Sequence, residues 1–165
     1  MLCKRILVSL GLVFICVQAH AGDVNRAFAA AQGGDFETAM DEWKPLAEQG
    51  FARAQYNIGV MHEMGEGVPQ DYKEAVKWYT LAAKQGYIFA QYNLALKYFN
   101  GNGVAKDPDE AVKWYMLAGE QGHVKSQYNL AVMYDTGDGI PEDNAAALKW
   151  YTLAANRGHI KAQYN

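Results

Sequence analysis

The sequence predicts an all-α solenoid, a stack of helix pairs, and three observations support this fold class. Residues 51–86, 87–122 and 123–158 align without a gap at a period of 36, and the first two copies are identical at half of their positions. Each copy holds two stretches with apolar residues at helical spacing, joined by a glycine-rich loop. A fixed period of this length is typical of stacked repeats, in which neighbouring helix pairs bury each other's apolar faces.

Both halves of a unit predict amphipathic helices. In the second copy Ala90, Leu94 and Tyr98 stand four residues apart, so they share one face of a helix. Residues 109–118 show the same helical period. We expect the recurring large residues of the second half to fill the space between helices; these are Trp78, Trp114 and Trp150, with Leu81, Leu117 and Leu153.

The loop between the halves reads GEGVPQD, GNGVAKD and GDGIPED in the three copies. Its paired glycines predict a helix that ends in a left-handed residue, followed by a sharp turn. Its closing aspartate predicts an N-cap for the next helix. The structural residues predicted in these loops are Gly65, Gly67, Asp71, Gly101, Gly103, Asp107, Gly137, Gly139 and Asp143.

The spacing A-x-x-x-L-G/A-x-x-Y-x-x-G-x-G-V-x-x-D-x-x-x-A-x-x-W-x-x-x-A-A-x-x-G resembles the Sel1-like repeat family, a longer-looped relative of the tetratricopeptide repeat. Nearly all of the chain after residue 21 fits this pattern. It departs at His62, at Ala95 and Ala131, and at Gly119, where the family has tyrosine, glycine and alanine. The resemblance implies a right-handed α/α solenoid whose repeats scaffold protein complexes.

Residues 1–21 have the features of a secretory signal peptide. Lys4 and Arg5 form a basic start, and residues 6–17 form an apolar stretch too short to span a membrane as a helix. Ala19 and Ala21 are small residues at the positions that a signal peptidase reads, so we expect cleavage after Ala21. An uncleaved anchor is the alternative.

Export also fits the composition of the remaining chain. Both cysteines, Cys3 and Cys16, lie in the leader, so the mature chain must rely on its core rather than on disulfides. Loss of Lys4 and Arg5 takes the formal net charge from −3 to −5, which argues against nucleic acid as a partner. No later stretch is apolar enough to cross a bilayer. We expect a periplasmic or secreted protein without a membrane span after cleavage.

The two ends of the predicted solenoid (22–165) are atypical. Residues 22–50 form a shortened unit, with a first helix near 24–32, a two-glycine loop and Pro45, which should kink the second helix. Trp43 aligns here with Tyr79, and we interpret this unit as the N-terminal cap. Residues 159–165 repeat only the start of a unit. Either the natural chain continues, which we favour, or the last helix pair meets another molecule.

The strongest candidate binding feature is the triplet Gln-Tyr-Asn, which recurs at 55–57, 91–93, 127–129 and 163–165. Its tyrosines fall on the open side of the first helix, and the resemblance implies that first helices line a concave face. The alternative is that these tyrosines pack between adjacent first helices. Residues that vary between copies are candidates for specificity, since interfaces favour aromatic and arginine side chains. The predicted partner-binding residues are Arg53, Tyr56, Phe89, Tyr92, Phe99, Lys125 and Tyr128.

No pattern predicts a catalytic residue, a metal site or a cofactor. His123 and His159 occupy a slot that Phe51 and Tyr87 fill in other copies, which indicates packing. Residues 135–139 resemble a calcium loop but lack its further acidic ligands. The resemblance therefore implies a non-enzymatic, exported adaptor that binds a protein or peptide on its concave face.

Two alternatives stay open. Some secreted Sel1-like proteins are described as binding or hydrolysing β-lactams or cell-wall fragments. Those members are rich in disulfides, whereas the mature chain here has no cysteine and has Ser126 as its only serine. The other alternative is a truncated product without its own activity. The sequence leaves the oligomeric state open.

Overall fold

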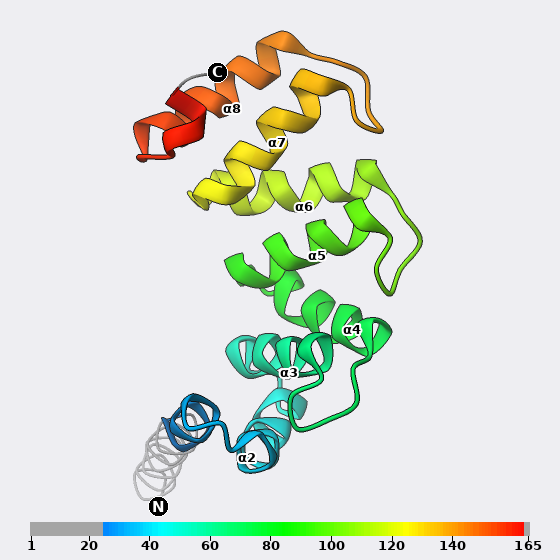
Figure 1. Cartoon of the computed structure of the whole chain (residues 1–165), viewed down its shortest axis with the longest axis vertical. Coiled ribbons are helices and arrows are strands. Elements are labelled where there is room, and N and C mark those ends of the chain that lie inside the picture. The colour runs from blue at the N-terminus through cyan, green and yellow to red at the C-terminus, as the bar shows by residue number, and fades with distance from the viewer. Residues whose placement is uncertain (1–24, 164–165) are drawn as a thin grey trace, which may run out of the picture.

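The protein is an all-α solenoid, as the sequence predicts. The computed structural model describes residues 25–163, and every regular element in that range is a helix (Figure 1). Residues 25–32 are helical and precede α2. The other elements are α2 (Phe36–Glu48), α3 (Ala52–Met64), α4 (Tyr72–Lys84), α5 (Ile88–Asn100), α6 (Pro108–Glu120), α7 (Val124–Thr136), α8 (Asn144–Asn156) and the short 3₁₀ helix η1 (Ile160–Gln163).

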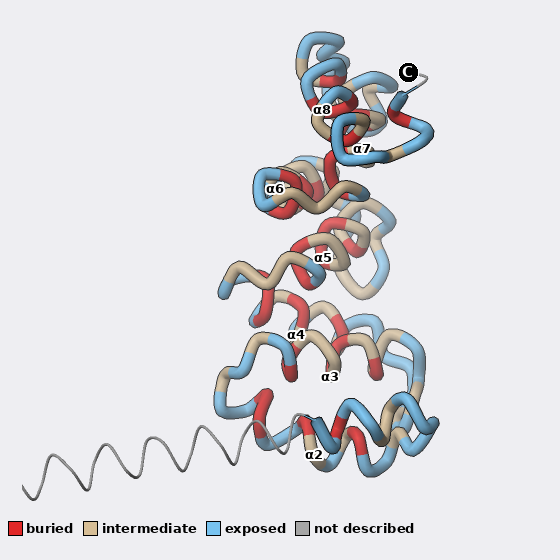
Figure 2. The backbone as a smooth tube through the Cα atoms, turned by 90° about the vertical axis from the view of Figure 1, so that its left-hand side faces the viewer, coloured by how far each residue is buried: buried red, intermediate tan, exposed pale blue. Residues whose placement is uncertain are grey.

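Each helix contacts the helices before and after it in the chain, so the pairs α3–α4, α5–α6 and α7–α8 stack in order. Buried residues follow the facing sides of successive helices along the whole stack (Figure 2). The core is therefore a ribbon of three neighbouring clusters that follows the stack, as expected for repeats that cover one another. The predicted signal peptide, residues 1–21, lies outside the described residues. The helix α2 continues through Pro45 to Glu48.

Aspartate and glycine set the helix boundaries. Asp71 precedes α4, and its Oδ1 accepts hydrogen bonds from the N–H groups of Lys73 (2.9 Å) and Glu74 (3.1 Å). Asp35, Asp107 and Asp143 cap α2, α6 and α8 in the same way. The helices α3, α5 and α7 end at glycines with positive φ, namely Gly65, Gly101 and Gly137. The capping side chains supply acceptors for N–H groups that a helix leaves unpaired.

The second glycine of each loop lies against the preceding unit. A Cβ on Gly103 would stand 2.2 Å from the carbonyl oxygen of Tyr72, at the start of α4, and φ is +77° at this residue. Gly67 approaches the carbonyl oxygen of Phe36 in the same manner, and Gly139 approaches α6. Only glycine fits both the conformation and the close contact, so each loop rests on the first turn of the previous second helix.

Tyrosines are the most deeply buried large residues of α4 and α6, and the predicted Trp78 and Trp114 pack beside them against the core. Tyr79 and Tyr115 are fully buried, whereas Trp78 and Trp114 are half-buried. Leu81 is 46% exposed because it stands two residues, and so about 200°, around the helix from Tyr79. Leu117 is exposed for the same reason.

Of the three predicted tryptophans Trp78, Trp114 and Trp150, the last is buried. A Cβ on Gly119 would lie 3.1 Å from the Trp150 ring. The glycine at this departure from the family pattern therefore makes room for the indole of the next unit.

The triplet glutamines join consecutive units. Gln91 is 3% exposed, and its Nε2 donates to the carbonyl oxygen of Ala83 at the end of α4 (3.2 Å). Gln55 donates in the same way to Ala47 (3.1 Å), and Gln127 donates to Gly119 (2.8 Å). Each of these carbonyls also accepts the N–H of the turn glycine three residues later, so the glutamine supplies a second donor from the next unit.

A second glutamine completes two of these three junctions. Gln85 Nε2 donates to Gln55 Oε1 (2.7 Å), and Gln121 Nε2 donates to Gln91 Oε1 (2.8 Å). At the third junction Arg157 occupies the equivalent position and donates instead to the Gly122 carbonyl oxygen (3.0 Å). The Oε1 atom of Gln127 is consequently buried without a hydrogen-bond partner.

Replacing Gln91 with leucine should lower the free energy of unfolding by about 1–3 kcal/mol, because two hydrogen bonds across the junction are lost, one to the Ala83 carbonyl and one from Gln121 Nε2. Gln127→Leu is the matched control. It should cost less, since it also removes an unpaired oxygen. Urea unfolding of the three proteins measures the difference, and an equal or larger loss for Gln127→Leu would contradict this account of the junctions.

Candidate functional site

The helices α3, α5 and α7 carry the triplet tyrosines on one surface, which we call the tyrosine face. Each tyrosine lies between a buried tyrosine of its own unit and the first residue of the next unit. The Tyr92 ring centroid is 6.0 Å from that of Tyr115 and 4.7 Å from that of His123. Tyr128 stands 5.9 Å from Tyr151 and stacks on His159 at 4.2 Å. These tyrosines are half-buried, so they support the surface as well as form part of it.

Other predicted binding residues are more accessible. Phe89 is 51% exposed. Its ring is tilted against the Tyr56 ring and edge-on to the His123 ring. Arg53 and Lys125 are exposed, and the Arg53 guanidinium lies 5.0 Å from the Phe28 ring centroid. Phe99 is half-buried. All seven predicted residues thus belong to the three first helices α3, α5 and α7.

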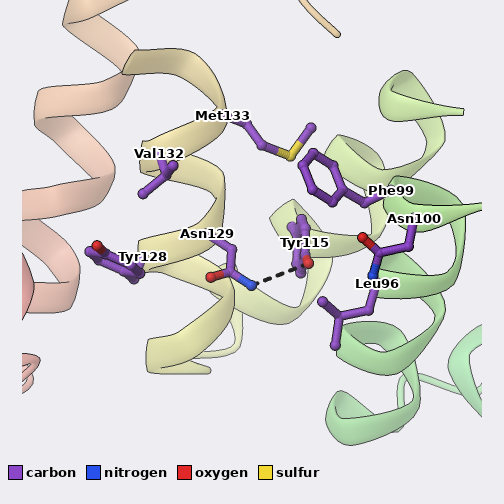
Figure 3. A pocket seen from close by; sticks show the side chains of 8 residues that line it. All are labelled: Leu96, Phe99, Asn100, Tyr115, Tyr128, Asn129, Val132 and Met133. Atoms are coloured by element: carbon purple, nitrogen blue, oxygen red, sulfur yellow. Dashed lines mark hydrogen bonds between the residues drawn. The ribbon is translucent and has the colours of Figure 1, made fainter. Parts of the chain in front are cut away.

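The triplet asparagine reaches the core tyrosine beneath it. Asn129 Nδ2 donates to the Tyr115 hydroxyl (3.2 Å), as the dashed line in Figure 3 shows. Burial raises the pKa of that hydroxyl, and the hydrogen bond from Asn129 partly offsets this effect. A neutral tyrosine hydroxyl both donates and accepts, so it satisfies the amide.

A buried ion pair and a tyrosine hydroxyl lie at the junction between the first and second full units. Lys97 Nζ forms an ion pair with Glu63 Oε1, and the Tyr79 hydroxyl donates to Glu63 Oε2 (2.6 Å). The Lys97 side chain is 6% exposed, and its Nζ lies 5.0 Å from the Tyr72 ring centroid. Burial and the bond to Glu63 raise the pKa of the Tyr79 hydroxyl far above its usual value. The paired groups therefore satisfy one another between α3 and α5.

At the next junction apolar residues occupy the same two positions. Phe99 and Met133 stand 36 residues after Glu63 and Lys97. Between them lies a cavity of about 280 Å³, which we call the α5–α7 pocket (Figure 3). Its walls are mainly apolar, and Tyr115 lies between the two helices; the lining residues are Leu96, Phe99, Asn100, Tyr115, Tyr128, Asn129, Val132 and Met133.

A second hollow of about 490 Å³ shares Tyr128 and Asn129 with the α5–α7 pocket. It also contacts Tyr92, Lys125 and Lys161. One unit earlier, Phe89 takes the position of Lys125. The tyrosine face therefore offers an apolar pocket beside a hollow bordered by two lysines.

His123 acts as a cap as well as a packing residue. Its Nδ1 accepts a hydrogen bond from the Ser126 N–H at the start of α7 (3.3 Å). Burial, followed by the positive charge of Lys125, lowers the pKa of the imidazole. The sequence predicted the packing from the slot that His123 shares with Tyr87, but it missed this capping bond.

Within residues 25–163, no three His, Cys, Asp or Glu side chains are grouped as a metal ion would require. In the same part of the chain, no helix combines the length and apolar character needed to cross a membrane.

The family model of the Sel1 repeat matches residues 52–87, 88–123 and 124–159. The chain belongs to the Sel1 repeat family. The matched segments follow the 36-residue units within one residue. Solenoids built from Sel1 repeats generally serve as scaffolds for protein interactions.

Two solved Sel1-type structures resemble this one closely. The first is c5321, described as a protective antigen of uropathogenic Escherichia coli with an SLR fold; it is 38% identical with a TM-score of 0.84 over 93% of this chain and 34% of its own. The second is a Sel1 repeat protein from Oxalobacter formigenes, 34% identical with a TM-score of 0.79 over 84% of this chain and 57% of its own. This chain thus spans about a third and somewhat over half of those two chains.

A curated relative matches a shorter stretch. The rat protein named DAP3-binding cell death enhancer 1 is 40% identical over 43 residues, which make up 26% of this chain and 8% of the relative. Helicobacter pylori cysteine rich protein B shares the fold, with a TM-score of 0.52 at 23% identity.

Lys97→Met should destabilise this Sel1 repeat protein by about 3 kcal/mol, because it leaves the Glu63 carboxylate buried without its cation. We take the lower end for a broken buried pair, since the Glu63 side chain keeps 21% exposure. The double change Glu63→Phe with Lys97→Met copies the next junction and should recover most of the loss. A double-mutant cycle by urea unfolding measures this coupling, and additive effects would show that the pair contributes nothing.

His123→Tyr, the residue found at position 87, should make stability less dependent on pH between 7 and 5. The lowered pKa of His123 means that the unfolded chain takes up a proton first as the pH falls. Stability from this group is therefore present above the unfolded pKa, about 6.5, and is lost below it. Other titrating groups are common to both proteins. Equal losses of melting temperature at pH 5 would contradict the role of His123.

Proposed function

We propose that the chain is an exported, non-catalytic scaffold that binds an extended segment of a partner protein on its tyrosine face. One observation carries the proposal: the α5–α7 pocket is open and apolar at a junction whose neighbour is filled by the Glu63–Lys97 pair. An apolar side chain of the partner would enter this pocket. A buried anchor of this kind supplies much of the binding free energy in protein interfaces.

The chemistry around the pocket supports a peptide rather than a small apolar ligand. Asn129 lies at the boundary of both hollows, and its amide can bond to a peptide backbone beside the anchor. Lys125 and Lys161 border the neighbouring hollow, which favours an acidic residue next to the apolar one. Phe89 and the tyrosines extend the surface along α3 and α5.

Export rests on the leader-like features of residues 1–21 and the cysteine-free remainder of the chain. The related c5321 is described as a protective antigen, which fits a molecule that reaches the cell exterior. The printed name of the rat relative describes a protein that binds another protein, which fits a scaffolding role for the shared repeat. A scaffold requires no catalytic group, and we propose none.

Peptides selected from a random display library on this protein should share a large apolar residue with an acidic residue beside it. Val132→Arg should then weaken their binding by at least about 30-fold, because the guanidinium fills the pocket and removes an anchor worth about 2 kcal/mol. Leu117→Arg is the matched control, since Leu117 is 44% exposed on α6 and lines neither hollow.

Fluorescence anisotropy gives the dissociation constants, and thermal unfolding verifies that both variants remain folded. Equal effects of the two arginines, or selected peptides without an apolar anchor, would place binding away from the α5–α7 pocket. The same purified protein should leave nitrocefin unchanged, and turnover would contradict the non-catalytic role.

A further inference from the structure

The junction between the cap and the first full unit also holds a hollow, of about 290 Å³, which we call the cap pocket. It repeats the α5–α7 pocket two units earlier, since Asn57 and Val60 stand 72 residues before Asn129 and Val132. Its apolar walls include Phe28, Phe36 and Val60.

Two buried donors of the cap pocket lack partners. Trp43 occupies the position that Tyr79 and Tyr115 hold in the full units. An indole N–H only donates, so the triplet asparagine has no hydroxyl to bond. The Nε1 of Trp43 and the Nδ2 of Asn57 are both buried without a protein partner. Trp43 is 4% exposed, and both residues line the pocket.

Two unpaired donors in one cavity can both bond to an acceptor oxygen of a ligand. Buried polar groups are normally paired, and leaving them unpaired costs free energy that a suitable ligand recovers. Glu66 lines the same pocket, so its negative charge opposes an anionic ligand, and its carboxylate can accept an N–H. An uncharged carboxamide meets both demands, with its oxygen toward Trp43 and Asn57 and its N–H toward Glu66.

We propose that the cap pocket binds a carboxamide group of a partner polypeptide, with the attached hydrocarbon against Phe28, Phe36 and Val60. The inference deepens the proposed function and rests on it, because the ligand belongs to the segment bound along the tyrosine face. Its readout is separate: Trp43 reports on the cap pocket, and display selection reports on the α5–α7 pocket. Either site can therefore fail without the other.

The experiment follows the Trp43 indole N–H by NMR in the purified ¹⁵N-labelled protein, with the resonance assigned by its loss in Trp43→Phe. The probes are isovaleramide, N-methylisovaleramide and isovalerate, which share a hydrocarbon tail. An amide should shift the indole proton downfield and slow its exchange with water. Isovalerate should bind at least about tenfold more weakly. Tighter binding of the primary amide identifies an Asn or Gln side chain as the source, and tighter binding of the secondary amide identifies the peptide backbone.

Asn57→Asp should weaken amide binding about tenfold or more, because a carboxylate accepts the Trp43 N–H itself and repels the ligand oxygen. Asn102→Asp makes the same change on an exposed loop outside the pocket and should leave binding unchanged. Trp43→Phe keeps the aromatic packing and should weaken amide binding similarly. Because this variant lacks the indole N–H, its binding is followed by the Asn57 side-chain amide resonances.

Three results would overturn the proposal. One is a Trp43 indole proton that exchanges rapidly with water and whose chemical shift does not change with either amide, since water would then satisfy the donors. Another is equal binding of isovalerate and isovaleramide. The third is unchanged amide binding in both Asn57→Asp and Trp43→Phe.

Discussion

A hydrogen bond from a buried glutamine amide to a carbonyl of the preceding helix pair holds the solenoid in register. The helices α2, α4 and α6 each end with a carbonyl that can accept a second hydrogen bond, and the following first helix supplies that donor at a fixed place. Because the bond is directional and buried, it fixes how far one unit can slide or rotate against the next. The apolar ribbon supplies most of the stabilisation, but apolar contacts alone would tolerate small shifts.

Fixed register is what makes the junctions comparable. The same backbone positions meet at every junction, so a change of side chain changes the contents of the junction and little else. A tyrosine, a glutamate and a lysine fill one junction, whereas a phenylalanine and a methionine leave an apolar pocket at the next. At the cap, an indole in place of a tyrosine leaves donors unpaired. The scaffold is constant, and the recognition chemistry is set by a few positions along the tyrosine face.

The period, the loop glycines and the capping aspartates were enough to predict the all-α solenoid. The glycines and aspartates act locally on the backbone, and the period indicates that equivalent units stack. The sequence could not separate the roles within Gln-Tyr-Asn, since the triplet recurs unchanged and gives no contrast. Its glutamine joins units, its tyrosine supports a surface and its asparagine bonds to a core tyrosine. Helical spacing alone does not rank the burial of neighbouring positions, so it does not show that Tyr79 lies deeper than Trp78. The exchange of Glu63 and Lys97 for Phe99 and Met133 is visible in the aligned copies, but only coordinates show that these residues meet across a junction.

The charged junction also bears on how such a chain can change by duplication. If the third copy followed the first directly, Glu63 would face Met133 and its carboxylate would have no cation. If the second copy were doubled, Phe99 would face a lysine. The repeat units are therefore not interchangeable. A change in their order creates junctions that the original array does not contain. Their order is itself inherited information, and a rearranged array would acquire new chemistry without a single point mutation.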